Sequence, residues 1–324
     1  MSDSSRKLKP AQRVDFDAEL VFLINKREMW KIFFKSQENS SRMNETYSNF
    51  ENRNSGQSLK YQLMSKYKIR KFSTSRIATI DVCEMGKKKH HVAAFLEIDV
   101  TSAKEKIKKY KKEVGKISFI AWLIKVIGHT VADKNAIAAY LVGKQKTIVF
   151  DDVNISFLIE KEINGEKVPL PVVIEKANTL EIETITQLLN ASKQETLSNN
   201  QIVIQKRATR AEKFYYHLPG FIRRVIWKFM LKRPKMLFAK MGNVAVTSLG
   251  MYGKINGWFV PISIHPVCFG IGSVMKKPVV IGDKIEIRDI MNMTVLIDHD
   301  VIDGGSMARF ISALNKNIEE GIFL

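Results

Sequence analysis

A short stretch near the C-terminus combines a histidine, three acids and two glycines in a pattern that could support acid–base chemistry. Residues 298–306 read Asp-His-Asp-Val-Ile-Asp-Gly-Gly-Ser. An imidazole has an ordinary pKa of about 6.5, so His299 can accept a proton near neutral pH. Asp303 follows four residues later and can fold back across the glycine turn to fix the local geometry. Taken alone, the pattern fits equally well a surface histidine that pairs weakly with a nearby acid.

The residues on either side of this stretch predict a strand before it and a helix after it. MTVLIDHD has the apolar, β-branched composition of a strand, and the helix is expected over 306–320. Ser306 is expected to be its N-cap and Gly321 its stop, because serine accepts backbone hydrogen bonds and glycine tolerates the left-handed conformation. One face of this helix is apolar and consists of Met307, Phe310, Ile311, Leu314 and Ile318.

Strand-like and helix-like segments also alternate earlier in the chain. Residues 91–100 predict a largely buried strand followed by a basic helix with Thr101 as its cap, and residues 118–133 predict an apolar core helix. Asn164-Gly165 and Gly282-Asp283 are each flanked by strand-like runs and predict tight hairpins, since these residues tolerate positive φ. Intermingled elements of this kind indicate an α/β fold, specifically an α+β two-layer sandwich.

Several further motifs occur in a fixed order between residues 72 and 324. They are HVAAFLEIDVT, ISFIAWLIKVIGHTVAD, VPLPVVIEKANTLEI, NVAVTSLGMYG and WFVPISIHPVCFGIGSV. Together with the H-x-x-x-D-G pattern that starts at His299, they resemble the catalytic domain of 2-oxoacid dehydrogenase dihydrolipoyl acyltransferases, in the chloramphenicol-acetyltransferase-like superfamily. The resemblance implies a mixed sheet with flanking helices. It also implies a homotrimer with active sites in channels between subunits, which coenzyme A and the acyl acceptor enter from opposite sides.

The resemblance assigns roles to four residues. It implies that His299 is the general base, and that Asp303 holds the loop through an ion pair with an arginine of the first strand region, for which Arg76 in STSRIATIDV is the best match. Thr247 in AVTSLG is implied as the hydroxyl that hydrogen-bonds the tetrahedral oxyanion, with Ser248 as the fallback. A base and an oxyanion donor are what acyl transfer from a thioester requires. Read from composition alone, Thr247 is equally a packing residue and Arg76 an exposed cation.

One departure from the family pattern lies beside the candidate base. The acyltransferases usually have Asp-His-Arg where this chain has Asp298-His299-Asp300. The extra carboxylate of Asp300 is expected to raise the pKa of His299 or to alter acceptor preference.

The N-terminal part of the chain differs in amino-acid composition from the rest. Residues 35–63 are dominated by Ser, Asn, Glu and Gln and predict a linker. We therefore expect residues 1–71 to be a mostly polar, disordered extension and residues 72–324 to be the acyltransferase domain. The extension has no room for a lipoyl domain, which favours a stand-alone form without covalently bound lipoate. Whether Met64 is the true start is left open.

The net charge and the cysteine content indicate which cellular compartment and which kinds of binding partner to expect. The chain of 324 residues has a formal net charge of +19, which favours acidic partners such as nucleic acid, a phosphate-bearing cofactor or an anionic membrane. Its two cysteines, Cys83 and Cys268, lie far apart and predict neither a disulfide framework nor a zinc cluster. This content fits a reducing cytoplasm, and no metal site is expected. No recognisable nucleic-acid module accompanies the charge, so nucleic acid is not the favoured partner.

Much of the positive charge gathers in residues 203–240, which hold a single acid, Glu212. Six apolar residues there fall at helical spacing, with the cations off that face; they are Phe221, Ile222, Val225, Ile226, Phe229 and Met230. Three uses remain open for this basic amphipathic helix. It could pack on the domain with a solvated cationic rim, lie on an anionic membrane with Trp227 at the interface, or attract the phosphates of coenzyme A.

The expected function is therefore a coenzyme-A-dependent acyltransferase that modifies a thiol, hydroxyl or amine, located in the cytoplasm and in one alternative peripheral at a membrane. A second possibility is a dihydrolipoamide acyltransferase that works with a separate lipoyl carrier protein. A third is a non-catalytic trimeric scaffold. The sequence leaves open the acyl chain, the acceptor and any assembly beyond a trimer.

Overall fold

A computed structural model describes residues 68, 75–143, 145–163, 166–194, 215, 218–250, 253 and 255–324. The chain divides after Arg70, and all the described helices and strands belong to the unit from Lys71 to Leu324. Apart from Lys68, the expected N-terminal extension lies outside the described residues, as does the turn at Asn164-Gly165. No helix in the described part of the chain is both long and apolar enough to cross a membrane.

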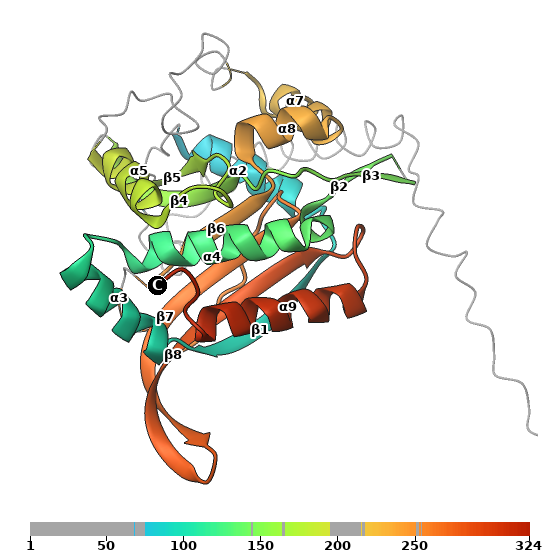
Figure 1. The fold of residues 1–324 in the computed structure, drawn as a ribbon. Helices are drawn as coiled ribbons and strands as arrows, with labels where there is room; N and C mark the ends of the chain where they lie inside the picture. The colour runs from blue at the N-terminus through green and yellow to red at the C-terminus, as the bar shows by residue number, and fades with distance from the viewer. Residues whose placement is uncertain are drawn as a thin grey trace, which may run out of the picture. The chain divides into compact units, whose positions relative to one another are not determined.

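A six-stranded mixed sheet in the order β1-β8-β7-β6-β4-β5 forms the centre of this unit (Figure 1). Its strands are β1 (His91–Asp99), β4 (Ile155–Ile163), β5 (Glu166–Ile174), β6 (Val244–Ser248), β7 (Val267–Ile281) and β8 (Lys284–Asp298). The short strand β6 runs parallel to both of its neighbours, while the other pairs are antiparallel. A separate ribbon pairs β2 (Tyr140–Val142) with β3 (Lys146–Ile148).

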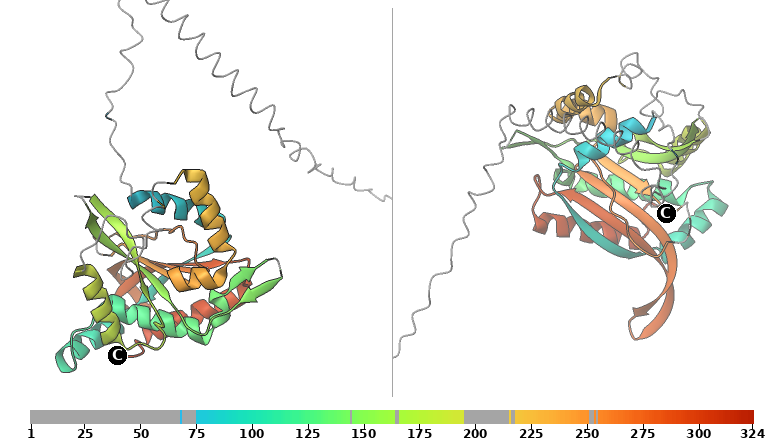
Figure 2. Two further views of the ribbon diagram at one scale, coloured as in Figure 1. Left: turned by 90° about the horizontal axis from the view of Figure 1, so that it is seen from above. Right: turned by 180° about the vertical axis from the view of Figure 1, so that it is seen from behind.

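Helices cover both faces of the sheet (Figures 1 and 2). One face carries α4 (Phe119–Asp133) and α9 (Gly304–Glu319), flanked by α3 (Thr101–Glu113) and α5 (Ile182–Gln194). Together they bury the main core, which includes Trp122, Phe157, Phe269 and Phe310. On the opposite side, α2 (Ser75–Gly86), α7 (Gly220–Leu231) and α8 (Pro234–Met241) enclose a smaller cluster around Met85, Trp227 and Ile264. The 3-10 turn η3 (Asn135–Ala138) follows α4.

Both predicted hairpins are present, but two predicted caps are wrong. Thr101 does not cap α3; its hydroxyl accepts a hydrogen bond from the backbone N–H of Asp289 at 2.8 Å, because the helix start is pressed against β8. The N-cap of α9 is Asp303 rather than Ser306, since the two glycines that suggested a turn are the first residues of the helix. Strand β1 is also less buried than predicted, because it lies at the edge of the sheet and exposes Phe95.

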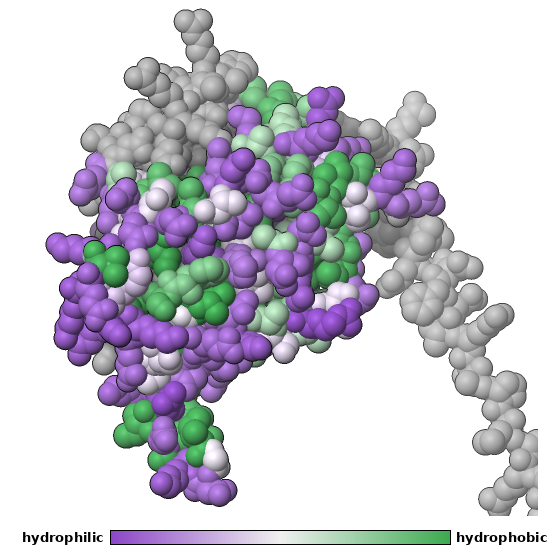
Figure 3. Space-filling model, viewed as in Figure 1, coloured by the Kyte–Doolittle hydropathy of each residue, from purple (hydrophilic) through white to green (hydrophobic). Residues whose placement is uncertain are grey.

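The β7–β8 hairpin continues well beyond its neighbouring strands (Figure 1). Strand β6 pairs with β7 only as far as Ile271, and β1 pairs with β8 only from Ile290 onward. Within the sheet, residues 276–289 are therefore paired only with each other and form a two-stranded arm. Apolar side chains are exposed on this arm, among them Ile285 at 76% and Ile287 at 73% (Figure 3). An isolated ribbon with exposed isoleucines is typical of an element that packs on another chain.

Candidate functional site

The candidate base His299 occupies an exposed turn at the end of β8. Asp298 is the last residue of the strand, and His299 follows it with its backbone N–H donated to the carbonyl oxygen of His90 at 3.0 Å. Its imidazole makes no hydrogen bond with any other described residue, and the residue is exposed. The ring is thus free to meet a molecule that approaches from outside this chain.

The acids on either side of His299 are held by other residues. Lys89 donates from Nζ to Oδ2 of the buried Asp298 at 2.6 Å. Asp300 accepts from Nδ1 of His90 at 2.8 Å, and this bond raises the pKa of His90. Asp300, whose carboxylate was predicted to act on His299, is therefore paired with His90. The histidine turn is braced from both sides by the segment that enters β1.

A second layer of histidines supports this brace. His91 donates from Nε2 to the carbonyl oxygen of His265 at 2.9 Å. His265 is buried, donates from Nε2 to the carbonyl oxygen of Met241 at 2.9 Å and accepts at Nδ1 from the hydroxyl of Ser263 at 2.9 Å. Burial lowers the pKa of His265 to about 4, so the ring is neutral. Sequence reasoning missed the contacts of His91 with His265 and of His265 with Met241, because each depends on a backbone carbonyl brought close only by the fold.

Asp303 shapes the turn through its helix rather than through Arg76. Its carboxylate caps α9 by accepting from the backbone N–H of Ser306 at 2.7 Å. This bond, followed by the charge of Arg309, holds the pKa of Asp303 below its usual range. The ion pair predicted between Asp303 and Arg76 is not found among the described residues, and the cation that acts on the Asp303 carboxylate is Arg309. The carboxylate is already used by the backbone of the turn that carries His299.

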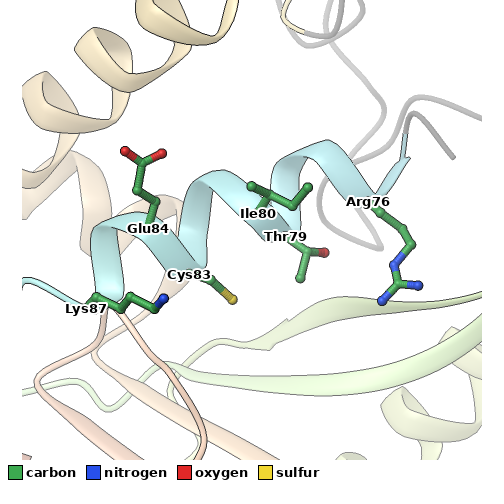
Figure 4. Close-up of a pocket in the computed structure, with 6 residues that line it drawn as sticks. All are labelled: Arg76, Thr79, Ile80, Cys83, Glu84 and Lys87. Carbon is green, nitrogen blue, oxygen red and sulfur yellow. The ribbon is translucent and has the colours of Figure 1, made fainter. Parts of the chain in front are cut away.

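Arg76 lies on a helix, not in a strand region as predicted. It belongs to the first turn of α2, where Ala78, Val82 and Met85 face inward at helical spacing. A pocket of about 390 Å³ runs along this helix, lined by Arg76, Thr79, Ile80, Cys83, Glu84 and Lys87 (Figure 4). It contains neither His299 nor Thr247, so the described pocket is separate from the candidate chemistry.

Thr247 lies in the middle of the sheet, far from His299 of the same chain. It pairs with Gly270 on β7, and Gly270 pairs with Thr294 on β8. His299 comes five residues after Thr294, so at about 4.8 Å between strands and about 3.3 Å per residue the two lie roughly 19 Å apart. Both are at least partly accessible to solvent. Within one chain they cannot contact the same carbonyl group.

A comparison with protein families assigns most of the chain to one family. Residues 65–203 and 235–324 match the family model described as 2-oxoacid dehydrogenases acyltransferase (catalytic domain). The chain belongs to this acyltransferase family. The fold class expected from the sequence, an α/β domain with a mixed sheet and flanking helices, is confirmed. Among the described residues, this member has no cluster of three or more His, Cys, Asp or Glu that could hold a metal ion.

Individual relatives in the acyltransferase family are similar over different lengths. A dihydrolipoyllysine-residue acetyltransferase component of the pyruvate dehydrogenase complex from Rickettsia bellii is 38% identical over 78 residues, covering 24% of this chain and 19% of that protein. The mitochondrial dihydrolipoyllysine-residue succinyltransferase component of the 2-oxoglutarate dehydrogenase complex from Bos taurus is 22% identical over 236 residues, covering 71% of this chain and 44% of that protein. The matches therefore span less than half the length of these relatives.

A solved structure shares the fold of this family member at low sequence identity. The cubic core of the pyruvate dehydrogenase multienzyme complex superposes with a TM-score of 0.56 and is 16% identical. The match covers 82% of this chain and 96% of that chain. The acyltransferase fold is thus retained in nearly all its parts.

Proposed function

We propose that this protein is an acyltransferase that moves an acyl group from a coenzyme A thioester to a thiol, hydroxyl or amine. The observation that carries the proposal is the exposed imidazole of His299. The turn is held on both sides by Lys89 and His90, while the His299 ring makes no hydrogen bond with another described residue. A packing histidine would use its ring nitrogens within the fold, as His265 does. A general base must keep one nitrogen available for the substrate.

The reaction needs the nucleophile to lose a proton as it attacks. His299 would take the proton from the acceptor thiol, hydroxyl or amine while a bond forms between the acceptor and the thioester carbonyl carbon. The oxyanion of the tetrahedral intermediate would accept a hydrogen bond from Thr247. As the carbon–sulfur bond breaks, the imidazolium returns its proton to the sulfur of coenzyme A. Atoms and charge then balance, and the base is restored.

The site would be completed by a second copy of the chain. His299 and Thr247 are separated by roughly 19 Å within one chain, whereas one carbonyl must contact both. A homotrimer in which the turn of one subunit faces β6 of the next satisfies this requirement, and repeated head-to-tail contacts close into a ring. The exposed isoleucines on the arm of residues 276–289 supply a surface for such a contact. The cubic core that shares the fold supports an assembly of this kind.

The acceptor could also be dihydrolipoamide on a separate carrier protein. The relatives are named as acyltransferase components that act on dihydrolipoyllysine residues, which favours this version. A non-catalytic trimeric scaffold is less consistent with a braced turn that leaves the His299 ring free. We place the enzyme in the cytoplasm, as its two unpaired cysteines suggest.

Purified protein with a panel of acyl-CoA donors tests the proposal through release of free coenzyme A thiol. Dihydrolipoamide and small alcohols or amines serve as acceptors in parallel. Turnover is expected with at least one acceptor, and His299→Ala should abolish it. Thr247→Ala should lower kcat by about 10² to 10³, as removal of an oxyanion donor does. Unchanged rates in both variants would refute this mechanism, and no turnover with any pair would favour the scaffold.

A further inference from the structure

Helix α7 lies between the two segments of the chain that match the acyltransferase family model. The family model matches residues up to 203 and resumes at 235, whereas α7 spans Gly220–Leu231. The helix therefore lies in a part of the chain that the family pattern does not account for. Its contacts with the rest of the domain are formed mainly with α2 and α8.

A buried polar network fixes the rotation of α7 about its own axis. Arg223 donates from Nε to Oδ2 of Asp81 on α2 at 2.7 Å and from a terminal nitrogen to the carbonyl oxygen of Leu218 at 2.6 Å. Tyr215 donates its hydroxyl to the same carboxylate and accepts from Nε1 of Trp227 at 2.9 Å. Asp81 is 2% exposed, so releasing this network would leave a buried charge without its partner.

This rotation corrects the role expected for Trp227 and for half of the apolar face. Trp227 is only 3% exposed and belongs to the cluster between α2 and α8, so it does not lie at the outer surface. Three other apolar side chains point away from the domain instead: Phe221 is 62%, Val225 is 60% and Phe229 is 49% exposed. They follow one another at every fourth position and lie within roughly 80° on the helix surface. They form a continuous outward stripe.

Cations border this stripe and acids are absent from it. Arg224 and Lys228 lie one step around the helix from the stripe, and Lys232 follows its C-terminal end; all three are exposed. Arg233 places its guanidinium carbon 4.0 Å from the centre of the Phe229 ring. The sequence from Leu218 to Asn243 contains no aspartate or glutamate. Glu84 of α2 pairs with Arg224 at 3.7 Å, and the other charged residues of α7 and α8 beside the stripe are cations. An exposed apolar stripe with a mainly cationic border is complementary to an anionic interface that has an apolar interior.

We propose that α7 docks the enzyme on an anionic lipid membrane, with the outward stripe inserted between the acyl chains and its cations at the headgroups. Helices that lie in the membrane interface combine these two features, and their affinity rises with apolar area and with anionic lipid. The ion pair between Arg223 and Asp81 would hold α7 in the orientation that binding requires. Binding would then cost little conformational entropy, because the helix is already ordered. The acyltransferase would thereby work beside lipid-soluble or lipid-anchored acceptors.

Co-sedimentation of the full chain with vesicles tests this docking directly. Vesicles of phosphatidylglycerol and phosphatidylcholine are expected to bind the protein at low salt, and vesicles of phosphatidylcholine alone should bind it at least about tenfold more weakly. Replacement of the stripe by Phe221→Ser, Val225→Ser and Phe229→Ser should lower binding by about tenfold or more while coenzyme A release stays unchanged. Circular dichroism checks that the variant is folded.

A matched pair of charge variants separates the stripe from the general charge of the protein. Lys228→Gln with Lys232→Gln removes two cations beside the stripe, whereas Lys109→Gln with Lys112→Gln removes two exposed cations from α3, which has no outward apolar stripe. The first pair should weaken vesicle binding several-fold and the second should not. Equal losses of vesicle binding in the two pairs would show that binding depends only on the overall charge of the protein. That result would overturn the proposal.

Failure to bind either vesicle would also overturn the proposal, and α7 would then be assigned to an acidic protein partner. Wild-type binding by the stripe variant would do the same. Because α7 holds neither His299 nor Thr247, a negative result would leave the proposed acyl transfer untouched, and a loss of acyl transfer in the His299 variant would leave docking untouched.

Discussion

His90 and Asp300 are joined by a hydrogen bond of 2.8 Å from Nδ1 to Oδ1, across two segments that meet only in the folded chain. The bond engages the acid next to His299 with a different histidine. Together with the ion pair between Lys89 and Asp298, it ties the turn at the end of β8 to the start of β1. The position of His299 thus depends on residues that do not take part in the chemistry.

Removing the charge of Asp300 should return the pKa of His90 toward its ordinary value of 6.5. The hydrogen bond and the charge of Asp300 are what raise that pKa, and Asp300→Asn removes the charge. Because the pKa is raised in the folded chain, the pair stabilises the fold below pH 6.5, and this contribution is lost as pH rises through the raised pKa. NMR titration of labelled histidines and melting curves measure both effects.

Asp283→Asn, at the exposed tip of the arm, is the control for this titration. It should leave the His90 resonance and the pH dependence of melting unchanged. If Asp300→Asn leaves the His90 titration as in wild type, the two side chains do not pair in solution.

Mixed trimers should regain activity that neither parent variant has. When His299→Ala and Thr247→Ala chains assemble at random, an interface with His299 from one chain and Thr247 from the next arises in about a quarter of the sites. Coenzyme A release by the co-expressed mixture is therefore expected at about a quarter of the wild-type rate. Mixing the purified parents without exchange gives the baseline. A mixture no more active than that baseline would show that no active site combines His299 of one chain with Thr247 of another, and would overturn the shared site.

Much of the fold could be predicted because its signals are local. The hairpin at Gly282-Asp283, the apolar helix α4 and the helix stop at Gly321 each follow from a few neighbouring residues. Predictions failed where a distant contact decided the outcome. Thr101 was expected to cap α3, but β8 takes its hydroxyl. The position of β1 at the edge of the sheet could not be predicted either, because the order of the strands depends on pairing between distant segments.

The candidate site was only partly predictable for the same reason. The types and spacing of His299 and Asp303 indicated a general base and an acid that fixes the geometry of the turn. Asp303 does shape the turn, and it does so by capping α9. The brace from Lys89 and His90 bridges more than 200 positions. Helical spacing on α7 showed which residues are apolar but not which of them face outward. The ion pair between Arg223 and the buried Asp81 determines which side of the helix faces outward.

Adjacent arginines on α7 should differ sharply in their effect on stability. Arg223 pairs with Asp81, which is nearly fully buried, so Arg223→Ala should lower the free energy of unfolding by about 3 kcal/mol. Arg224 lies 3.7 Å from Glu84 in an exposed pair, so Arg224→Ala should change it by less than about 1 kcal/mol. Urea denaturation followed by circular dichroism measures both, and equal effects would show that the buried network is not formed.

The exposed arm should be required for assembly. Ile285 and Ile287 are more than 70% exposed, and burying each against a second chain would contribute about 1.5 to 3 kcal/mol per contact. Ile285→Ser with Ile287→Ser is expected to shift the protein from trimer to monomer in sedimentation velocity. Val114→Ser, at a residue 66% exposed at the end of α3, is the control and should leave the trimer intact. A trimer that persists in the arm variant would place the interface elsewhere.

The buried His265 should make the fold sensitive to acid. Its pKa is lowered to about 4 in the folded chain, from 6.5, so the unfolded chain binds more protons as pH falls through that window. Stability is then retained above pH 6.5 and lost progressively toward pH 4, by roughly 3 kcal/mol in all. His265→Gln keeps a donor for Met241 and should flatten this dependence, whereas His129→Gln on the exposed side of α4 should not. Urea denaturation at successive pH values measures the slope, and a slope unchanged by His265→Gln would mean that this ring is not held neutral by the fold.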